Sequence, residues 1–439
     1  MLLKKHFLKI RKMKFLNKIF IILFFISSTN ELKADSLFNS LNSAYLKNPK
    51  LNAERASMKA TREEKRESVS EFLPSITVSG YISDQDNTNT DGSDSNFKPA
   101  EQSITIEQKI FQGGGAVANF MKKKHGQSLG EYKLKKVEQE ILLEAAKAHT
   151  ELLLNLKKVN INLANIDLLE RQVETDQNRL EKGEINLTDL AQSESSLAGA
   201  NAKLISAQND LVTSKANFEK IIGEKPPKNI KENITLSLKL PGSLASAYKI
   251  SNTENPDLQI ALLEFKQSEL DVIIAGSELA PSATLSYKIA EQDDFSSTVK
   301  DRTQQTAKAT ATWPLFSGGS NLFNLRKNQE IKNQKELLYE DAKKKVETDV
   351  ANAWSSYQSS KSVLESIESQ VKAAEIANEG ITLEYETGNS RTTLEVIQSR
   401  SILLNSRIDL ASSERNFLIS QFKLLSAVGR LTSKQLNLK

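Results

Sequence analysis

The amino-acid sequence predicts an α+β membrane protein that joins long α-helices to a transmembrane β-barrel with four strands per chain. Three observations predict this fold class. The chain contains two internal repeats with a period of about 206 residues. Each repeat holds two segments in which every second residue is apolar, which is typical of strands that face two different environments. Each repeat also holds a helical pattern far longer than an ordinary globular helix.

Matching landmarks at matching distances define the two repeats. An Asn-Pro pair precedes a Pro-Ser pair by 25 residues in each half (74 − 49 and 281 − 256), and a phenylalanine precedes a single glycine by 72 residues (183 − 111 and 388 − 316). The landmarks are Pro49, Pro74, Phe111 and Gly183 in the first half and Pro256, Pro281, Phe316 and Gly388 in the second. A pore built from equivalent elements fits this duplication better than a single catalytic pocket does.

The first 34 residues are expected to be a secretory signal peptide. They contain eight basic residues and one acid, followed by an apolar core over residues 19–26 that is too short to span a bilayer. Cleavage is expected after Ala34, and Met13 is an alternative start. The formal charge of +4 falls to −3 (51 − 54) without this segment, so the composition gives no reason to expect a nucleic-acid partner.

The rest of the chain has no means of membrane attachment other than strands. It contains no cysteine, and therefore no disulfide and no acceptor for an N-terminal lipid. After residue 34, no apolar stretch approaches the ~20 residues that a membrane helix needs. Entry into a membrane therefore requires a β-barrel.

The first repeat, residues 35–223, is read in order as helix, hairpin and helical hairpin. Helices are expected over residues 36–71, and Pro74 ends them. Strands follow at about 75–83 and 103–111, joined by a polar loop. A helix then runs over about 114–182, with apolar residues at a mean spacing of about 3.6 between positions 137 and 173. Gly183 breaks it, and a shorter helix covers about 187–222.

The second repeat, residues 243–439, follows a linker at residues 224–242 and shows the same order. Strands are expected at about 282–290 and 303–315, and helices at about 318–387 and 391–429. Trp313 and Phe316 suit an aromatic girdle at a membrane interface. A helix of about 70 residues reaches roughly 100 Å, which exceeds the diameter of a globular domain.

Four strands cannot close a transmembrane barrel, because about eight is the smallest number known to do so. An open sheet edge in lipid leaves unpaired backbone groups that cost several kcal/mol each. The barrel must therefore be shared between chains. Two chains would give eight strands around a filled interior, and three would give twelve around a lumen.

Several motifs show that the chain resembles the TolC-like outer-membrane efflux family over residues 35–439. They are Ala44-Tyr45 with Asn48-Pro49, Ala247-Tyr248 with Asn255-Pro256, a Pro-Ser that opens a strand in each half, Leu315–Gly319, and the closing Ile222-Gly223 and Val428-Gly429. The resemblance implies a homotrimer in which a twelve-stranded barrel stands on a long α-helical coiled-coil barrel. It also implies location in the cell outer membrane, with the helices in the periplasm, and partners that include outer-membrane lipid, a periplasmic adaptor (membrane fusion) protein and an inner-membrane pump or ABC transporter.

The resemblance also implies a role for the two helical hairpin tips. In the family, links between the hairpins close the periplasmic entrance, and by position Asp189 would accept from Tyr385 while Arg391 would bond near Thr188. Glu395 would contribute to an acidic entrance ring, which Gln398 weakens here. The tip residues expected to meet the adaptor are Arg179, Gly183, Ile185, Gly388 and Ser390.

The sequence carries few residues or motifs that are typical of metal binding, cofactor binding or catalysis. No metal-ligand cluster and no cofactor motif is present, and the only histidines are His6, His125 and His149. Gly113–Gly115 lack the Gly-Lys-Ser/Thr of a phosphate loop and are read as a flexible bend. Residues 126–130 match a nucleophile elbow around Ser128, but they lie in a helical pattern.

The sequence therefore predicts no enzyme but a channel, the exit duct of a tripartite efflux pump or a type I secretion system. Two alternatives stay open. A periplasmic adaptor-type structural protein would share the helical hairpins, and an exported hydrolase would need a working Ser128.

Overall fold

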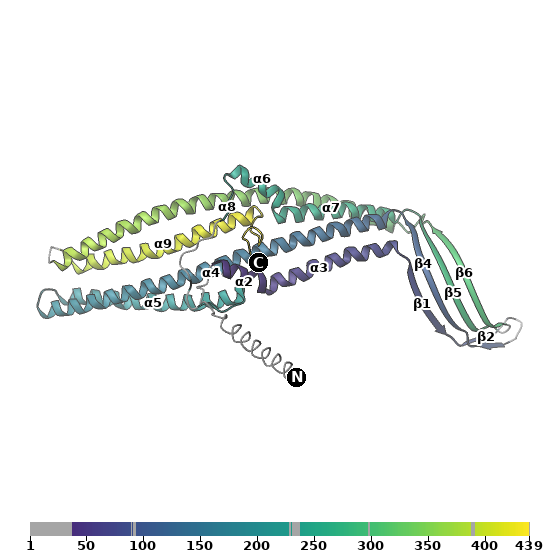
Figure 1. Ribbon diagram of the computed structural model, residues 1–439, viewed down its shortest axis with the longest axis horizontal. Helices are drawn as coiled ribbons and strands as arrows, with labels where there is room; N and C mark the ends of the chain where they lie inside the picture. The colour runs from purple at the N-terminus through teal and green to yellow at the C-terminus, as the bar shows by residue number, and fades with distance from the viewer. Residues whose placement is uncertain are drawn as a thin grey trace, which may run out of the picture.

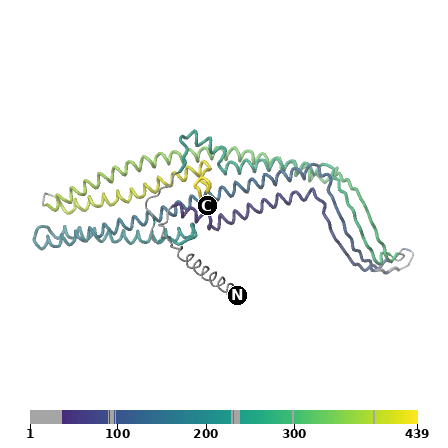
Figure 2. Tube along the Cα trace, in the orientation of Figure 1, coloured from purple at the N-terminus to yellow at the C-terminus, as the bar shows by residue number. Residues whose placement is uncertain are grey.

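The computed structural model describes residues 37–88, 90, 94–227, 230, 238–296, 299–387 and 391–438. The expected signal peptide, with Met13 and Ala34, and the tip residues Gly388 and Ser390 lie outside the described residues. The molecule is elongated, with two helical hairpins at one end and a bent sheet at the other (Figures 1 and 2).

Two very long helices, α4 (Gly115–Glu181) and α8 (Ser320–Glu386), form the length of the molecule at 67 residues each. Shorter helices pack along them. Helix α3 (Pro49–Val69) lies beside the sheet-side half of α4 and α5 (Leu187–Ile222) beside the other half, and α7 (Pro256–Ser277) and α9 (Thr393–Ala427) accompany α8 in the same way (Figure 1). The remaining elements are α2 (Leu37–Lys47), α6 (Leu244–Glu254) and the 3-10 turn Ser70–Phe72.

The Asn-Pro motifs begin helices and also fasten distant ones. Asn48 Oδ1 accepts from the backbone N–H of Lys50 at 3.0 Å, and its Nδ2 donates to the carbonyl of Ile221 at 2.9 Å. Asn255 Oδ1 accepts from the N–H of Leu258 at 3.1 Å, and its Nδ2 donates to the carbonyl of Ala427 at 2.8 Å. Each asparagine therefore caps the start of α3 or α7 and ties it to the end of α5 or α9.

The four-stranded antiparallel sheet has the order β1-β4-β5-β6, so the central pair joins the two halves of the chain. Its strands are β1 (Ser75–Ile82), β4 (Ala100–Gln112), β5 (Ser282–Ser296) and β6 (Val299–Thr312). A small ribbon of β2 (Gln85–Thr88) and β3 (Asp94–Phe97) occupies part of the stretch that was expected to be a loop.

Four strand ends differ from the expected ones by three or more residues. Strand β4 begins at Ala100 and β6 at Val299, three and four residues before their expected starts, and the ends of β5 and β6 differ as well. Strand β6 ends at Thr312, three residues before the expected end, because Pro314 has no N–H to donate to a ladder. Strand β5 continues to Ser296, six residues beyond the expected end, since its backbone still pairs with β6 where the apolar alternation has stopped. The sheet therefore extends farther from the helices than side-chain alternation indicates.

The two faces of the sheet differ in chemistry. We call one the apolar face; it carries Ile76, Val78, Ile82, Ile104, Ile106, Leu285, Tyr287 and Ile289, all of them exposed. The other, the polar face, carries alternate residues such as Ser79, Ser103, Thr105, Ser286 and Lys288. Ser103 and Ala290 on the polar face are only 4% and 3% exposed, so this is the more enclosed side.

Glycines in left-handed conformations connect the sheet to the long helices. Gly114 before α4 has φ +86°, and Gly319 before α8 has φ +87°. These φ values disfavour any residue with a Cβ. This agrees with the reading of Gly113–Gly115 as a bend.

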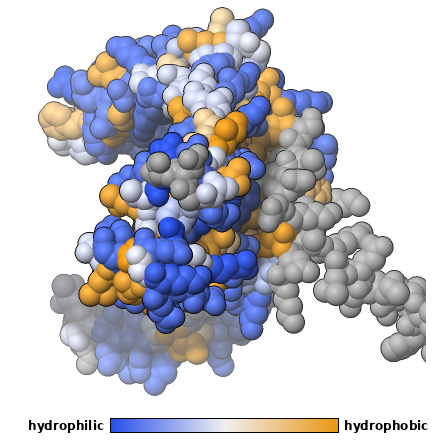
Figure 3. Space-filling model, turned by 90° about the vertical axis from the view of Figure 1, so that its left-hand side faces the viewer, coloured by the Kyte–Doolittle hydropathy of each residue, from blue (hydrophilic) through white to orange (hydrophobic). Residues whose placement is uncertain are grey.

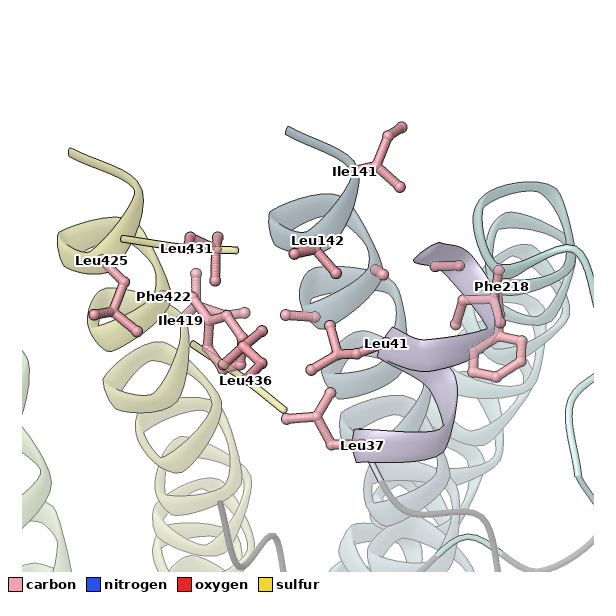
Figure 4. Close-up of a cluster of buried hydrophobic side chains, with 14 of the residues drawn as sticks. Leu37, Leu41, Ile141, Leu142, Phe218, Ile419, Phe422, Leu425, Leu431 and Leu436 are labelled. Carbon is pink, nitrogen blue, oxygen red and sulfur yellow. The ribbon is translucent and has the colours of Figure 1, made fainter. Parts of the chain in front are cut away.

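The main core lies midway along the helices. Its buried members come from α2, α3, α4, α5, α9 and the C-terminal segment, and include Leu37, Leu41, Ile141, Leu142, Phe218, Ile419, Phe422, Leu425, Leu431 and Leu436 (Figure 4). Figure 4 shows α2 between α4 and α5, with the C-terminal segment reaching across from α9. This cluster joins the first helical hairpin to the second.

Ser128 lies inside α4, with no strand before it and no sharp turn around it. The nucleophile elbow needs both. Ser128 is half-buried, whereas His149 is buried in the core with its Nδ1 2.8 Å from Ser40 Oγ. The hydrolase alternative therefore has no structural basis in these residues.

A buried polar cluster near the hairpin tips

The candidate functional site lies near the tips of the α4–α5 and α8–α9 hairpins, at the end opposite the sheet (Figure 1). Seen from this end, hydrophilic residues predominate and the molecule is hollowed on one side (Figure 3). No helix in the described ranges has both the length and the hydropathy to cross a membrane.

Gly183 forms the tip of the first hairpin. Its φ of +73° lets the N–H of Glu184 reach the carbonyl of Arg179 at 2.9 Å and its own N–H reach that of Leu180 at 2.9 Å. This is the hydrogen-bond pattern of a Schellman motif, which ends α4. Arg179 Nε also donates to Glu184 Oε2 at 3.2 Å, whereas Ile185 is half-buried.

Capping boxes start the returning helices. Asn186 Oδ1 accepts from the N–H of Asp189 at 3.0 Å, and Asp189 Oδ2 accepts from the N–H of Asn186. Thr392 and Glu395 make the same reciprocal bonds at the start of α9. Asp189 and Glu395 therefore have local structural roles, and backbone donation is the first cause of the lowered pKa of Glu395, with Arg391 adding to it.

Asp176 is the centre of a polar cluster that joins the two hairpins. Its side chain is fully buried, and its carboxylate accepts hydrogen bonds from Ser193 Oγ at 2.5 Å, Gln172 Nε2 at 2.9 Å and the Tyr385 hydroxyl at 2.9 Å. Ser193 comes from α5 and Tyr385 from the last turn of α8. Helices α4, α5 and α8 therefore meet at one carboxylate.

Thr393, the first residue of α9, completes the cluster. Its Oγ1 lies 3.1 Å from the Tyr385 hydroxyl, and Thr393 and Tyr385 are both buried. Burial raises the pKa of Tyr385; the Thr393 hydrogen bond opposes this rise, and the neighbouring Asp176 adds to it. Tyr385 therefore stays a neutral donor to Asp176 at physiological pH.

Two arginines border the cluster. The Arg179 guanidinium lies 4.7 Å from the centre of the Tyr385 ring, within the range of a cation–π contact. Arg400 of α9 donates to the carbonyl of Leu168 in α4 at 3.5 Å. Desolvation lowers the pKa of Arg400, and Glu386 and Asp176 act in the opposite direction, so the field of Arg400 reaches the cluster.

Within this chain, the two residues expected to close the gate have other partners than the expected ones. Tyr385 donates to Asp176 and not to Asp189, because Asp176 faces the second hairpin from the buried side of α4. Arg391 bonds to Glu384 Oε2 at 2.6 Å and to Glu395 Oε1 at 2.9 Å, and not near the exposed Thr188. Both of its partners belong to its own hairpin.

Sequence reasoning missed Asp176, Gln172, Ser193 and Thr393. A sign of Asp176 was present in the sequence. The helical stripe passes through Ile166, Leu169 and Val173, and Asp176 lies one step beyond, so an acid occupies an apolar position. An acid placed there must find buried donors.

The cluster suits a latch and does not suit a catalyst. Its one carboxylate has no exposure to a substrate, and its three donors hold it in place. Among the residues that the structure describes, no group of three or more histidines and acids could hold a metal ion. A buried carboxylate with three donors can link the helices that supply them, because separating these helices would leave its charge without hydrogen-bond partners.

Comparison with known proteins gives a consistent result. The family model "Outer membrane efflux protein" matches residues 40–224 and 247–430. The chain is 25% identical to the outer membrane efflux protein BepC of Brucella suis over 92% of this chain and 88% of that protein. It is 22% identical to the outer membrane protein TolC of Escherichia coli over 92% and 84%.

The fold is also similar to solved structures. The Campylobacter jejuni CmeC outer membrane channel superposes with a TM-score of 0.82 at 14% identity, over 92% of this chain and 87% of that one. The Neisseria gonorrhoeae MtrE outer membrane channel superposes with a TM-score of 0.75 at 17% identity, over 90% and 89%.

Proposed function

This chain belongs to the outer membrane efflux protein family, and on that basis we propose that three copies of it form an exit duct across the outer membrane and the periplasm. Members of the family are outer-membrane channels and not enzymes. The duct would receive cargo from a periplasmic adaptor and an inner-membrane pump or ABC transporter. A tripartite efflux pump and a type I secretion system are both compatible with this role.

The four-stranded sheet with two chemically distinct faces is the observation that carries the proposal. Its apolar face exposes Val78 at 75% and Ile82 at 84%, which suits contact with lipid and is costly in water. Among the residues that the structure describes, its outer strands β1 and β6 each pair on one side only. Pairing β6 of one copy with β1 of the next would satisfy both edges, and three copies would give twelve strands.

Internal duplication supports a ring of equivalent elements. Helices α4 and α8 have equal lengths, and α5 and α9 differ by one residue. With two hairpins per chain, three chains would place six similar hairpins around one axis. Such a ring gives a tubular helical part in the periplasm, with the hairpin tips toward the adaptor.

The cluster around Asp176 is proposed as the latch of the periplasmic entrance. It ties the α8–α9 hairpin to α4 and α5, so displacing one hairpin would break the Tyr385 bond to Asp176. The pump and adaptor would open the entrance by binding the separated arrangement more tightly. Arg391, Glu395 and Asp189 would act at the tips through local bonds, and the exposed Thr188 would act there by its position. The candidates for adaptor contact are Arg179, Gly183, Ile185, Gly388 and Ser390.

Purified protein in planar bilayers tests the proposed function. We expect a mass of three chains in detergent and stepwise conductance after insertion. A monomer that does not partition into lipid vesicles would contradict the duct. A periplasmic adaptor, the alternative from sequence, would instead be released by osmotic shock.

A further inference from the structure

The polar face of the sheet carries more cationic than anionic side chains. Over the paired rows of β1, β4, β5 and β6, this face carries four cations and two acids, a net charge of +2 (4 − 2). The cations are Lys109, Lys288, Arg302 and Lys308, and the acids are Glu101 and Glu107.

One ion pair on this face is internally neutral. Glu101 is 8% exposed and accepts from Lys288 Nζ at 2.5 Å and from Gln292 Nε2 at 2.7 Å. Its charge is therefore cancelled by a neighbour on the adjacent strand. The remaining charges are three cations and Glu107.

The remaining cations are open to solvent. Lys308 and Arg302 are exposed on β6, and Lys109 is exposed on β4. Among the described residues none of the three forms an ion pair, and Arg302 lies over the Phe295 ring at 4.8 Å, a contact that leaves its charge unbalanced. Glu107 lies in the same cross-strand row as Lys308, with Ser286 between them.

Charge on the opposite face has the other sign. In the same paired rows, the charged residues of the apolar face are Glu291, Asp293 and Asp301, all near one end of the sheet. The cations are therefore confined to the polar face, and this segregation does not follow from the alternation of polar and apolar residues alone.

We propose that the polar face of β4, β5 and β6 forms a cationic wall of the duct that favours anionic solutes over cationic ones. This inference rests on the proposed function, because only in a closed barrel does the enclosed polar face line a lumen. Three chains would multiply the excess of positive charge around the axis. Fixed charge of one sign inside low-dielectric walls raises the local concentration of counter-ions.

The ionic strength sets the distance over which the cationic wall can attract anions and repel cations. The Debye length is about 8 Å at physiological salt and about 30 Å at 0.01 M. Small ions far from the wall would be screened at high salt, whereas multivalent or extended anions that touch it would not. The selectivity should therefore be measured at low salt and should fade as salt is added.

Reversal potentials in planar bilayers under a potassium chloride gradient provide the test. In the double variant Arg302→Gln and Lys308→Gln, we expect the chloride-to-potassium permeability ratio at low salt to fall by about twofold or more. Glu107→Gln removes the opposing charge and should raise the ratio. Because Lys308 and Glu107 share one cross-strand row, opposite shifts from Lys308→Gln and Glu107→Gln would be hard to produce by a change of shape.

The matched control is Thr306→Gln with Thr310→Gln, which adds bulk to the same face of β6 without changing charge. Its ratio should stay at the wild-type value. Arg302→Lys should also keep the wild-type ratio, because it preserves the charge. Single-channel conductance near the wild-type size shows that each variant has folded and inserted.

Two failures are distinguishable. If the wild-type protein forms no conducting pore, the proposed duct is wrong. If it conducts and the charge-neutralised variant keeps the wild-type ratio at low salt, or the threonine control shifts it equally, the cationic wall is wrong and the duct is unaffected. Should Arg302→Gln prevent insertion, Lys109→Gln and Lys308→Gln measure the same effect separately.

Discussion

At the scale of single residues, Asp176 and His149 are two of the polar side chains that the helices bury completely. Asp176 is surrounded by hydrogen-bond donors from α4, α5 and α8, and His149 is packed in the central core beside Ser40 and Phe218. Neither residue is exposed. Both side chains therefore depend on the surrounding helices for their hydrogen-bonding and packing partners. Separation of these helices would remove those partners.

Replacing Tyr385 with phenylalanine should loosen the latch. The change removes a hydrogen bond to a buried carboxylate, which is worth about 1.5–3 kcal/mol, and leaves Asp176 with two donors. We expect a higher mean conductance in planar bilayers. The control is Tyr357→Phe on the same helix, where the ring stacks on Phe417 and no hydrogen bond of the hydroxyl is recorded in the described part of the chain. Equal conductance in both variants and the wild type would exclude a latch at Tyr385.

His149 should make the stability of the protein depend on pH. Burial lowers the pKa of His149 from 6.5 to about 4. Between these pH values, His149 is protonated in the unfolded chain and neutral in the folded chain. The contribution of His149 to the free energy of unfolding is fully present above pH 6.5. It is lost as the pH falls toward 4, and the total loss is about 3 kcal/mol. Thermal unfolding in detergent should show a smaller loss for His149→Gln than for the wild type over this range. Parallel pH profiles would contradict the assignment.

At the scale of elements, a short motif both begins a helix and anchors it. Asn48 and Asn255 use the carbonyl oxygen for the cap and the amide for a carbonyl more than 170 positions away in the chain. The equivalent arrangement at two places explains why the Asn-Pro pairs are such regular landmarks. Proline at the first helical position adds a fixed φ to each cap.

Substitution of Asn255 separates the two roles. Asn255→Asp keeps an oxygen for the cap and loses the amide donor to Ala427, whereas Asn255→Ala loses both. We expect alanine to destabilise by about 2 kcal/mol and aspartate by about half as much. Thermal unfolding in detergent measures the difference, and identical losses would mean that only the amide hydrogen bond to Ala427 matters and the cap does not.

Elements with a sustained pattern could be predicted from sequence, and their contacts could not. The stripe of α4 and the alternation in β1 repeat over many residues, so each was located within a few positions. The partner of Tyr385 was missed because it depends on which face of α4 turns toward α8. That choice is made by packing between halves of the chain, and no local pattern encodes it. The far ends of β5 and β6 were misjudged because backbone pairing persists after the alternation stops.

At the scale of the whole molecule, the apolar and polar faces of the sheet receive alternate residues along the same strands. Ile289 on β5 is exposed on the apolar face, while its neighbour Lys288 points to the polar face and reaches Glu101. A one-residue shift in register would exchange the two environments. Assembly in a membrane therefore tests the assignment of the faces directly.

A charge on the apolar face should prevent assembly in the membrane. Ile289→Lys would place an amine among lipid chains at a cost of about 2–4 kcal/mol per copy near the midplane. Ser286→Lys on the polar face of the same strand is the matched control, since its amine would meet water. We expect Ile289→Lys to be depleted from the outer-membrane fraction and Ser286→Lys to be retained. Equal recovery of both would reverse or remove the assignment of the faces.

The position of the central core has a mechanical consequence. From Leu152, the last α4 residue of the core, to Glu181 at its end, the helix covers roughly 44 Å at ~1.5 Å per residue, with only a small apolar cluster at Ile166, Leu169 and Ala200 along it. A hairpin that rotates about the core therefore moves most at its tip. A rotation of a few degrees would displace the tip by several ångströms, which is enough to separate the Tyr385 hydroxyl from Asp176 while every helical turn stays folded.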